Sequence, residues 1–280
     1  MANIMVQGTT SSAGKSFIST ALCRIFLEDG HMVAPFKSQN MSSKYYETKE
    51  GYKISTAQAL QAKAAGIEPS PNMNPILLKP NSDRQSDIIL RGEFYKKMGA
   101  LEYFDFKKDL KPFIMESYEE LEKDYEILVI EGAGSPAEIN LKANDIVNMG
   151  MAEMVDAPVI LVADIDRGGV FASLYGTVML LEKGERARIK GLIINKFRGD
   201  KRLLDSGIEM IEELLRIPVI GTIPFTPLEL VDEDSLVDYE KQCNNMPQRE
   251  EDMEIELQKL SKMVRENLDM DYIYSIMNLD

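Results

Sequence analysis

The chain has 280 residues and a mass of 31.6 kDa, which is enough for one large α/β domain or two small ones. Its 46 acidic and 32 basic residues give a net charge of −14, which repels nucleic acids and anionic membrane surfaces. We therefore expect no nucleic-acid partner and no membrane partner. Only two cysteines occur, and we find neither a secretory signal nor an apolar run long enough to cross a bilayer. These features predict a cytoplasmic protein.

A phosphate-binding turn is predicted near the N-terminus. An apolar strand over residues 3–8 leads into a turn of Gly, Thr and Ser, and a helix starts at Lys15. The backbone N–H groups of such a turn can bind phosphate, with Lys15 reaching the terminal phosphates and the Ser16 hydroxyl helping to hold Mg²⁺. Position 9 is Thr9 and the nearest glycine is Gly8, so the turn departs by one residue from the usual P-loop spacing. The alternative is a Ser- and Gly-rich turn that happens to precede a lysine.

Strand and helix alternate along residues 1–225. The predicted strands are continuous apolar runs and no hairpin signal appears, which is typical of a parallel sheet covered on both faces. We therefore expect an α/β fold with a mostly parallel sheet and helices on both faces. Further strands are predicted over 32–36, 87–90, 126–131, 157–163, 189–194 and 219–223, with extended chain and loop over 72–83. Helices are predicted over 15–29, 55–65 and 144–154, in one or two pieces around 107–123, and ending near 182 and 215.

Two charged residues stand where such a fold places its ligand groups, at the carboxyl ends of strands, and a third stands at the start of a predicted helix. Lys37 follows the strand 32–36 and could contact the same phosphates as Lys15, although lysine is also common at solvated strand ends. Glu131 ends the strand 126–131 before two glycines, a position typical of a carboxylate that holds Mg²⁺; the alternative is a surface carboxylate. Asp145 is expected to begin a helix, where it could simply be a cap.

The C-terminal region differs in composition from the rest. Residues 226–252 are acidic and polar and predict an exposed connecting segment, and residues 253–280 predict a helical tail. An amphipathic helix over 254–267 is expected to bury one side. That side comprises Ile255, Leu257, Leu260, Met263, Val264 and Leu268.

Several of these segments match the sequence pattern of one enzyme family. They are residues 7–16, which include the turn, then 34–41, 57–62, 73–80, 131–140, 145–150, 164–170 and 194–200. Together they resemble the amidoligase domain of the glutamine-dependent cobyric acid synthases of cobalamin biosynthesis. That domain is similar to dethiobiotin synthetase, whose P-loop has the same extra residue. The resemblance covers most of residues 1–225, and the string Glu-Gly-Ala-Gly-Ser-Pro-Ala-Glu-Ile-Asn at 131–140 is highly specific.

The resemblance implies an ATP- and Mg²⁺-dependent C–N ligase. ATP would phosphorylate a peripheral carboxylate of adenosylcobyrinic acid a,c-diamide, and ammonia would displace phosphate to give an amide, at four side chains in turn, producing cobyric acid. The implied nucleotide site comprises Gly8, Thr9, Ser11, Ser12, Ala13, Gly14, Lys15, Ser16 and Phe17, with Asn195 at the adenine.

Specific roles follow from the same resemblance. Lys37 would contact the γ-phosphate, Glu131 and Ser16 would bind Mg²⁺, and Asp145 would orient ammonia. Residues placed where substrate carboxylates could bind are Gln39, Asn40 and Ser42. The segment 53–56 departs from the family, whose members usually have an acidic residue followed by Gly-Arg there, so a second Mg²⁺ ligand stays open.

Family members usually carry a glutaminase domain after the amidoligase domain, and we expect none within these 280 residues. Its last predicted helix, over 260–277, looks like the segment that ends the full-length proteins. Glutamine hydrolysis needs a cysteine activated by a histidine. Neither Cys23 nor Cys243 has a suitable setting with His31, the single histidine, so we expect free ammonia or a separate glutaminase as nitrogen source. The resemblance leaves a homodimer open.

Other functions remain open on the sequence. The chain could be another carboxylate-activating synthetase of the dethiobiotin synthetase type. It could also be a P-loop switch or partitioning ATPase, or a binder of corrinoid or nucleotide without catalysis.

Overall fold

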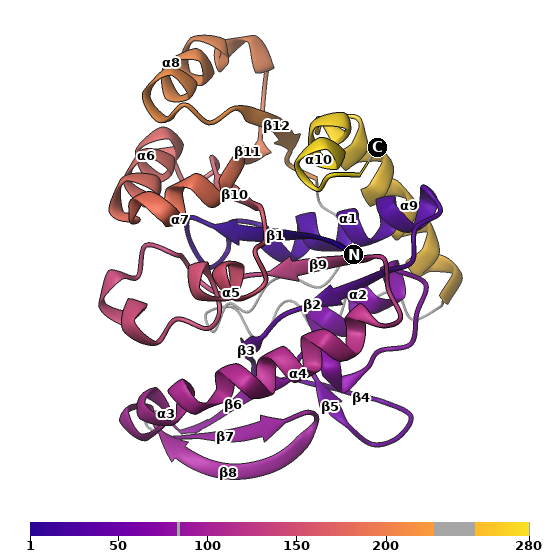
Figure 1. Ribbon diagram of the computed structural model, residues 1–280. Coiled ribbons are helices and arrows are strands. Elements are labelled where there is room, and N and C mark those ends of the chain that lie inside the picture. Colours follow the sequence, from indigo (N-terminus) through magenta and orange to yellow (C-terminus); the bar gives the residue numbers. More distant parts are fainter. Residues whose placement is uncertain (83–84, 227–249, 280) are drawn as a thin grey trace.

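A six-stranded parallel sheet forms the centre of the molecule (Figure 1). The computed structural model describes residues 1–82, 85–226 and 250–279. The strand order is β12-β11-β10-β1-β9-β2, and every neighbouring pair is parallel. The strands are β1 (Ala2–Gly8), β2 (Val33–Phe36), β9 (Ile127–Glu131), β10 (Val159–Asp164), β11 (Ile189–Phe197) and β12 (Val219–Pro224). The predicted parallel sheet is confirmed.

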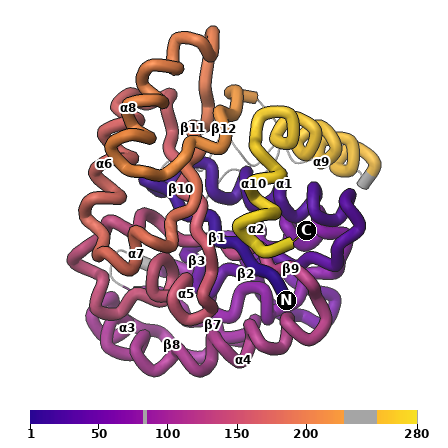
Figure 2. Tube along the Cα trace, turned by 45° about the horizontal axis from the view of Figure 1, so that its top comes forward, coloured from indigo at the N-terminus to yellow at the C-terminus, as the bar shows by residue number. Residues whose placement is uncertain are grey.

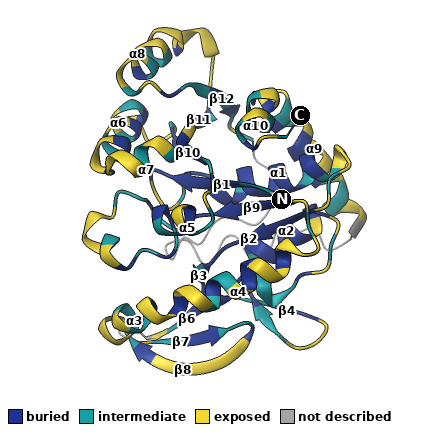
Figure 3. Ribbon diagram, viewed as in Figure 1, coloured by how far each residue is buried: buried dark blue, intermediate teal, exposed yellow. Residues whose placement is uncertain are grey.

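Both faces of this sheet are covered, as predicted. Because successive side chains of a strand point to opposite faces, Ile4 and Val6 of β1 join one apolar cluster and Met5 joins the other. The first cluster is covered by α1 (Lys15–Glu28), α2 (Thr56–Ala64), α9 (Glu250–Arg265) and α10 (Met270–Ile276). The second is covered by α4 (Lys111–Glu122), α5 (Met149–Met154), α6 (Val170–Leu180) and α8 (Asp205–Leu215), with α7 (Lys183–Arg188) beside α5. The central strands are almost wholly buried in Figure 3.

A second sheet corrects the expectation that hairpins are absent. Its order is β3-β6-β7-β8, with β3 (Gln39–Met41) parallel to β6 (Ile76–Ser82), and with β7 (Gln85–Leu90) and β8 (Glu93–Gly99) joined to it as antiparallel neighbours. Pro80 fits within β6 because the pairing with β3 reaches only Leu78, so its missing N–H is not needed there. No strand signal pointed to β8, because most of its residues are exposed (Figure 3) and charged side chains are mixed there with aromatic ones rather than forming an apolar run.

The remaining elements are short and lie between the larger ones along the chain. A small antiparallel pair is formed by β4 (Tyr46–Glu47) and β5 (Lys53–Ile54), and α3 (Ala100–Phe106) follows β8. Single turns of 3-10 helix are η1 (Pro71–Met73), η2 (Lys107–Leu110), η3 (Ile139–Asn144) and η4 (Lys201–Leu203). Ser55 caps α2 as its side chain accepts a hydrogen bond from the Ala57 N–H.

The expected helix over 144–154 is wrong at its start. Asp145 lies in a turn between η3 and α5, and α5 begins only at Met149. The Asp145 carboxylate accepts hydrogen bonds from the backbone N–H groups of Val147 (2.8 Å), Asn148 (3.0 Å) and Gly150 (2.9 Å). A Cβ at Gly150 would lie 2.1 Å from the Asp145 carbonyl oxygen, so only glycine allows this close turn.

The C-terminal segment forms two helices in place of the single helix expected over 260–277. Asp269 separates them and caps α10 through the Tyr272 N–H. Leu257, Leu260, Val264 and Leu268 are buried as predicted. The expectation for Ile255 is wrong: its side chain is 49% exposed, because it lies two residues from Leu257 and so points to another side of α9. Most of the predicted acidic connection, including Cys243, lies outside the described residues.

The C-terminal helices pack against the first helix of the chain. Figures 1 and 2 show α9 and α10 beside α1, although about 220 residues separate them in sequence. Arg265 of α9 pairs with Asp29 at 2.9 Å, and Ser261 donates a hydrogen bond to Glu28 at 2.9 Å. Among the described residues, none of the helices combines the length and the apolarity needed to span a bilayer.

This packing predicts that Leu260→Ala lowers the free energy of unfolding by about 2–5 kcal/mol, because it leaves a cavity in a fully buried position. Ile255→Ala on the same helix is the matched control and should cost about 0.5 kcal/mol or less. Urea unfolding of both variants measures the difference. Equal losses would show that α9 does not bury the side that the structure assigns to it.

Candidate nucleotide and substrate site

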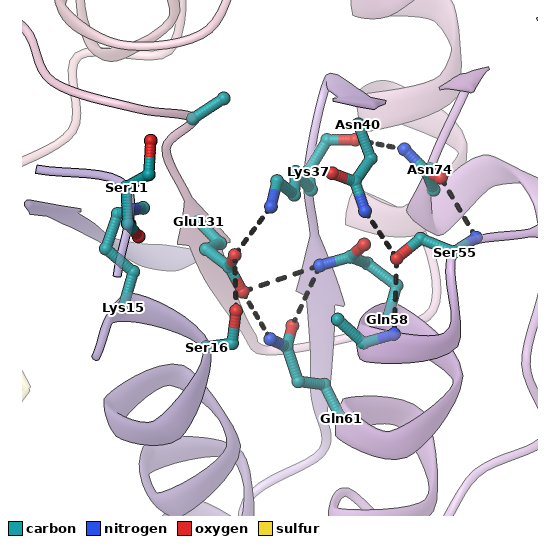
Figure 4. A network of polar contacts seen from close by, with 12 residues as sticks. Ser11, Lys15, Ser16, Lys37, Asn40, Ser55, Gln58, Gln61, Asn74 and Glu131 are labelled. Carbon is teal, nitrogen blue, oxygen red and sulfur yellow. Dashed lines mark hydrogen bonds and ion pairs between the residues drawn. The ribbon is translucent and has the colours of Figure 1, made fainter. Parts of the chain in front are cut away.

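The carboxyl ends of three neighbouring strands, β1, β9 and β2, meet at one edge of the central sheet (Figure 4). The P-loop follows β1, Glu131 ends β9, and Lys37 follows β2. Because the strands are parallel, these segments converge although they are far apart in sequence. The structure therefore brings together Lys15, Ser16, Lys37 and Glu131, as the sequence predicted.

The Glu131 carboxylate accepts several of the hydrogen bonds of this network. Its side chain is fully buried, and one carboxylate oxygen, Oε1, accepts hydrogen bonds from Lys37 Nζ (2.7 Å) and Ser16 Oγ (2.8 Å). The other oxygen, Oε2, accepts a hydrogen bond from Gln61 and lies 3.5 Å from Gln58 Nε2 (Figure 4). Neither glutamine was a candidate from sequence, although both belong to the quoted segment 57–62. A buried carboxylate is tolerated here because each oxygen has a donor.

The electrostatics keep this carboxylate ionised. Burial by itself raises the pKa of Glu131, but the charge and hydrogen bond of Lys37, the Gln61 hydrogen bond and the charge of Lys15 together lower that pKa below its usual value. An ionised carboxylate is the form that can bind a metal ion. Its partner Lys37 is buried as well, so the pair is shielded from solvent.

The P-loop is shaped by two glycines. Gly14 has a φ of 102°, and a Cβ at this position would lie 2.0 Å from Asn195 Nδ2. A Cβ at Gly8 would lie 3.0 Å from Lys15 Cγ, which explains why the glycine of this variant loop is at position 8. The Lys15 ammonium lies within the loop and donates hydrogen bonds to the carbonyl oxygens of Thr10 (3.0 Å) and Ser11 (2.8 Å).

Two residues near the end of β11 contact the backbone of the P-loop. The Asn195 amide donates a hydrogen bond to the Ala13 carbonyl at 2.9 Å. The next residue, Lys196, has a φ of 62° and its ammonium contacts the Ser12 carbonyl (2.7 Å) and Asp164 Oδ2 (3.0 Å). Two successive residues thus bind two successive carbonyls of the loop. Lys196 was not singled out from sequence, because its contact with the loop spans 184 positions.

The residues present fit a nucleotide with its metal ion. The P-loop offers backbone N–H groups and the Lys15 ammonium, which suit phosphates. Ser16 Oγ and Glu131 Oε1 are hard oxygen donors 2.8 Å apart. Mg²⁺ is often held by one or two protein ligands together with waters and substrate phosphates, so this pair suffices. No cluster of three or more His, Cys, Asp or Glu side chains suited to a metal occurs among the described residues, so a second carboxylate ligand stays open.

The three predicted substrate residues occupy different settings. Asn40 lies in the network of Figure 4, where its amide donates a hydrogen bond to Ser55 Oγ at 2.5 Å. Gln39 Oε1 accepts a hydrogen bond from the Tyr103 hydroxyl at 2.6 Å. Ser42 Oγ accepts one from the Lys44 N–H at 3.2 Å. Only Asn40 is thus joined to the buried polar residues around Lys37.

The Asp145 loop lies against the phosphate site. The Ser38 hydroxyl, next to Lys37, donates a hydrogen bond to the Ile146 carbonyl at 2.6 Å. The Asn148 amide exchanges two hydrogen bonds with the backbone of Ala133, two residues after Glu131. Ser38 and Asn148 had no assigned role from sequence. A cleft of about 70 Å³ that is partly open to solvent begins here, and its lining includes Ala133, Asn148 and Asp145.

A family profile matches most of this chain. Residues 4–237 match the CobQ/CobB/MinD/ParA nucleotide binding domain. The chain belongs to this family. The match agrees with the P-loop geometry and with the parallel strand order, and it confirms the predicted fold class.

The curated proteins most similar in this comparison include several cobyric acid synthases. The chain is 58% identical to a cobyric acid synthase of Clostridium botulinum over 87% of its own length and 49% of that protein's length. It is 57% identical to a cobyric acid synthase of Clostridium acetobutylicum over 88% of its own length and 50% of that protein's. The predicted resemblance is thereby confirmed, and the chain spans about half the length of these relatives.

Solved structures are more distant. The signal recognition particle receptor FtsY of Elizabethkingia anophelis, in complex with GDP, has a TM-score of 0.45 and 17% identity. The match covers 79% of this chain and 56% of that one. At this TM-score the likeness supports no further inference.

The contacts of Asn195 and Lys196 with the P-loop lead to a prediction. Lys196→Met removes a charged donor from the Ser12 carbonyl and from Asp164, so we expect the Kd for MgATP to rise about tenfold. Lys190→Met, at the exposed start of the same strand, is the control and should bind MgATP as the parent does. Isothermal titration calorimetry measures both. An unchanged Kd for Lys196→Met would show that the loop keeps its shape without this contact.

Proposed function

We propose that the chain is an ATP-dependent amidoligase that converts peripheral carboxylates of a corrinoid, adenosylcobyrinic acid a,c-diamide, into amides to give cobyric acid. The observation that carries the proposal is the buried Glu131–Lys37–Ser16 cluster at the P-loop, next to a cleft lined by Asp145. This arrangement offers a phosphoryl-transfer centre beside a space for a second substrate. The identity to cobyric acid synthases supports the choice of substrate.

In the first proposed step a substrate carboxylate oxygen bonds to the γ-phosphorus of ATP, and the bond from that phosphorus to ADP breaks. Lys15 and the loop N–H groups bind the phosphates, and Lys37 neutralises charge on the group in transfer. Mg²⁺, when bound by Ser16 and Glu131, offsets the charge of the phosphate oxygens. Asn195, at the end of β11, is proposed to contact the adenine, and Asn40 with Gln39 and Ser42 to contact substrate.

In the second proposed step ammonia attacks the carbonyl carbon of the acyl phosphate, the new C–N bond forms, and phosphate leaves. The nitrogen becomes positively charged before it loses a proton, and a nearby carboxylate stabilises that charge. Asp145 can serve, because a carboxylate has about four lone-pair positions and three backbone N–H groups use three of them. The remaining one is proposed to face ammonia in the cleft.

We propose three parts along the chain. Residues 1–225 form the amidoligase domain, residues 226–252 connect this domain to the C-terminal tail, and residues 253–280 form the helical tail, which supports α1. Ammonia comes from solution or from a separate glutaminase. The protein acts in the cytoplasm, with a homodimer as one form to be tested.

The decisive experiment incubates the chain with the corrinoid, MgATP and an ammonium salt at raised pH, where free NH₃ is abundant, and follows the corrinoid by mass spectrometry. We expect stepwise amidation, and a loss of about 100-fold or more in rate for Lys15→Ala. No mass change with the parent chain would overturn the proposal.

Glutamine in place of ammonium should give no product. Cys23 is buried and its burial raises the pKa of the thiol, the wrong direction for a nucleophile. Glutamate release that persists after both cysteines are replaced would contradict the expected source of nitrogen.

A second prediction separates catalysis from capping at Asp145. Asp145→Asn should lower kcat for amide formation at a nearly unchanged KM for ATP and corrinoid, because the lost charge acts on the second step. A cap alone predicts a loss of about 1 kcal/mol in stability with activity intact. Steady-state kinetics and urea unfolding of the same variant decide between the two.

A further inference from the structure

The cleft beside Asp145 contains a lysine that no step above uses. Lys107 begins η2, and its side chain lines the cleft together with Asp145, Asn148 and Ser135. The residue is only 9% exposed, so most of its length is packed within the protein. Its position was not singled out from sequence, because it stands in a charged stretch where lysines are expected on a solvated surface.

Lys107 has no acceptor within residues 1–82, 85–226 and 250–279. No described side chain or carbonyl receives a hydrogen bond from its ammonium, and no described carboxylate lies within ion-pair distance. Burial lowers the pKa of Lys107, and the charge of Asp145 opposes that effect. A buried cation is normally paired, because taking it out of water costs free energy. The Lys107 ammonium lines the cleft and has no such partner among the described residues.

The other cation of the cleft is already neutralised. Lys142 contacts the carboxylates of Glu182 and Glu185, each at 2.8 Å. Asp145 is held by backbone N–H groups and forms no ion pair with Lys107. Of the two lysines that line the cleft, Lys107 is therefore the one available to an incoming anion.

The segment that carries Lys107 is fixed against the Asp145 loop. The Asn144 amide, one residue before Asp145, donates a hydrogen bond to the Phe104 carbonyl of α3 at 3.0 Å. The Tyr103 hydroxyl donates another to Gln39 of β3 at 2.6 Å. These bonds join α3, which runs directly into η2, to the Asp145 loop and to β3, so the backbone that carries Lys107 is anchored beside the cleft.

We propose that Lys107 binds a carboxylate of the substrate, so that a neighbouring carboxylate of the same molecule reaches the phosphate site. The proposal rests on the proposed function for the identity of the substrate, which carries several carboxylates. It makes Lys107 a specificity residue: it recognises a polycarboxylate ligand in the cleft that Asp145 also lines, without taking part in phosphoryl transfer.

The test uses three variants of the whole chain. Lys107→Met keeps the unbranched stem and removes the charge, and Lys107→Arg keeps the charge. Lys108→Met is the matched control, because Lys108 is the next residue, is 56% exposed and pairs with Asp105 on the surface. Calorimetry measures the Kd for adenosylcobyrinic acid a,c-diamide, for tricarballylate as a simple tricarboxylate, and for MgATP as a readout of the folded site.

For Lys107→Met we expect the Kd of both carboxylate ligands to rise about tenfold or more, with that of MgATP unchanged. Lys107→Arg should recover much of the affinity, and Lys108→Met should bind like the parent. Equal corrinoid binding by Lys107→Met and the parent, or equal losses in Lys107→Met and Lys108→Met, would overturn the proposal while leaving the amidoligase function in place.

The two proposals can fail separately. A parent chain that binds MgATP and, through Lys107, tricarballylate, but not the corrinoid, would overturn the proposed substrate and support the anion site. A parent chain that binds neither carboxylate ligand would overturn both.

Discussion

The burial of one carboxylate, that of Glu131, constrains the arrangement of the whole site. A carboxylate out of water must be paired and hydrogen-bonded, or it would take up a proton. Lys37 supplies the charge, and Ser16 and Gln61 supply further hydrogen bonds. Because these donors come from β2, α1 and α2, satisfying Glu131 fixes three elements around the end of β9.

The same groups serve the proposed chemistry. Lys37 and Ser16 satisfy the buried carboxylate and are also the groups assigned to phosphate and metal, so the fold holds them where a ligand needs them. Binding groups held in this way lose little freedom when the ligand arrives, which favours preorganised electrostatic stabilisation. The hydrogen bonds from Asn195 and Lys196 to the carbonyl groups of Ala13 and Ser12 hold the P-loop backbone in the same way.

Remote parts of the chain contribute through this framework. The C-terminal helices α9 and α10 complete the apolar cluster around α1, the helix that carries Lys15 and Ser16. The second sheet, with α3 and η2 after it, brings Lys107 to the cleft beside the Asp145 loop. The central sheet thus carries the proposed nucleotide site, and the additions around it shape the proposed substrate site.

The sequence by itself determined the P-loop, the central strands and the charged residues at their ends. These signals are local: a glycine-rich turn before a lysine, apolar runs long enough for buried strands, and a carboxylate followed by glycines. Lys37 and Glu131 could therefore be predicted to converge once the strands were taken as parallel.

Only the tertiary structure decided which distant residues meet. Lys196 contacts a loop 184 positions away, and Lys107 looks like any surface lysine until the cleft is formed. The exposed strand β8 lacks the continuous apolar run of a buried strand, and Ile255 is excluded from the core by the orientation of α9 against α1. Contacts of this kind depend on how elements pack, which local residue patterns do not encode.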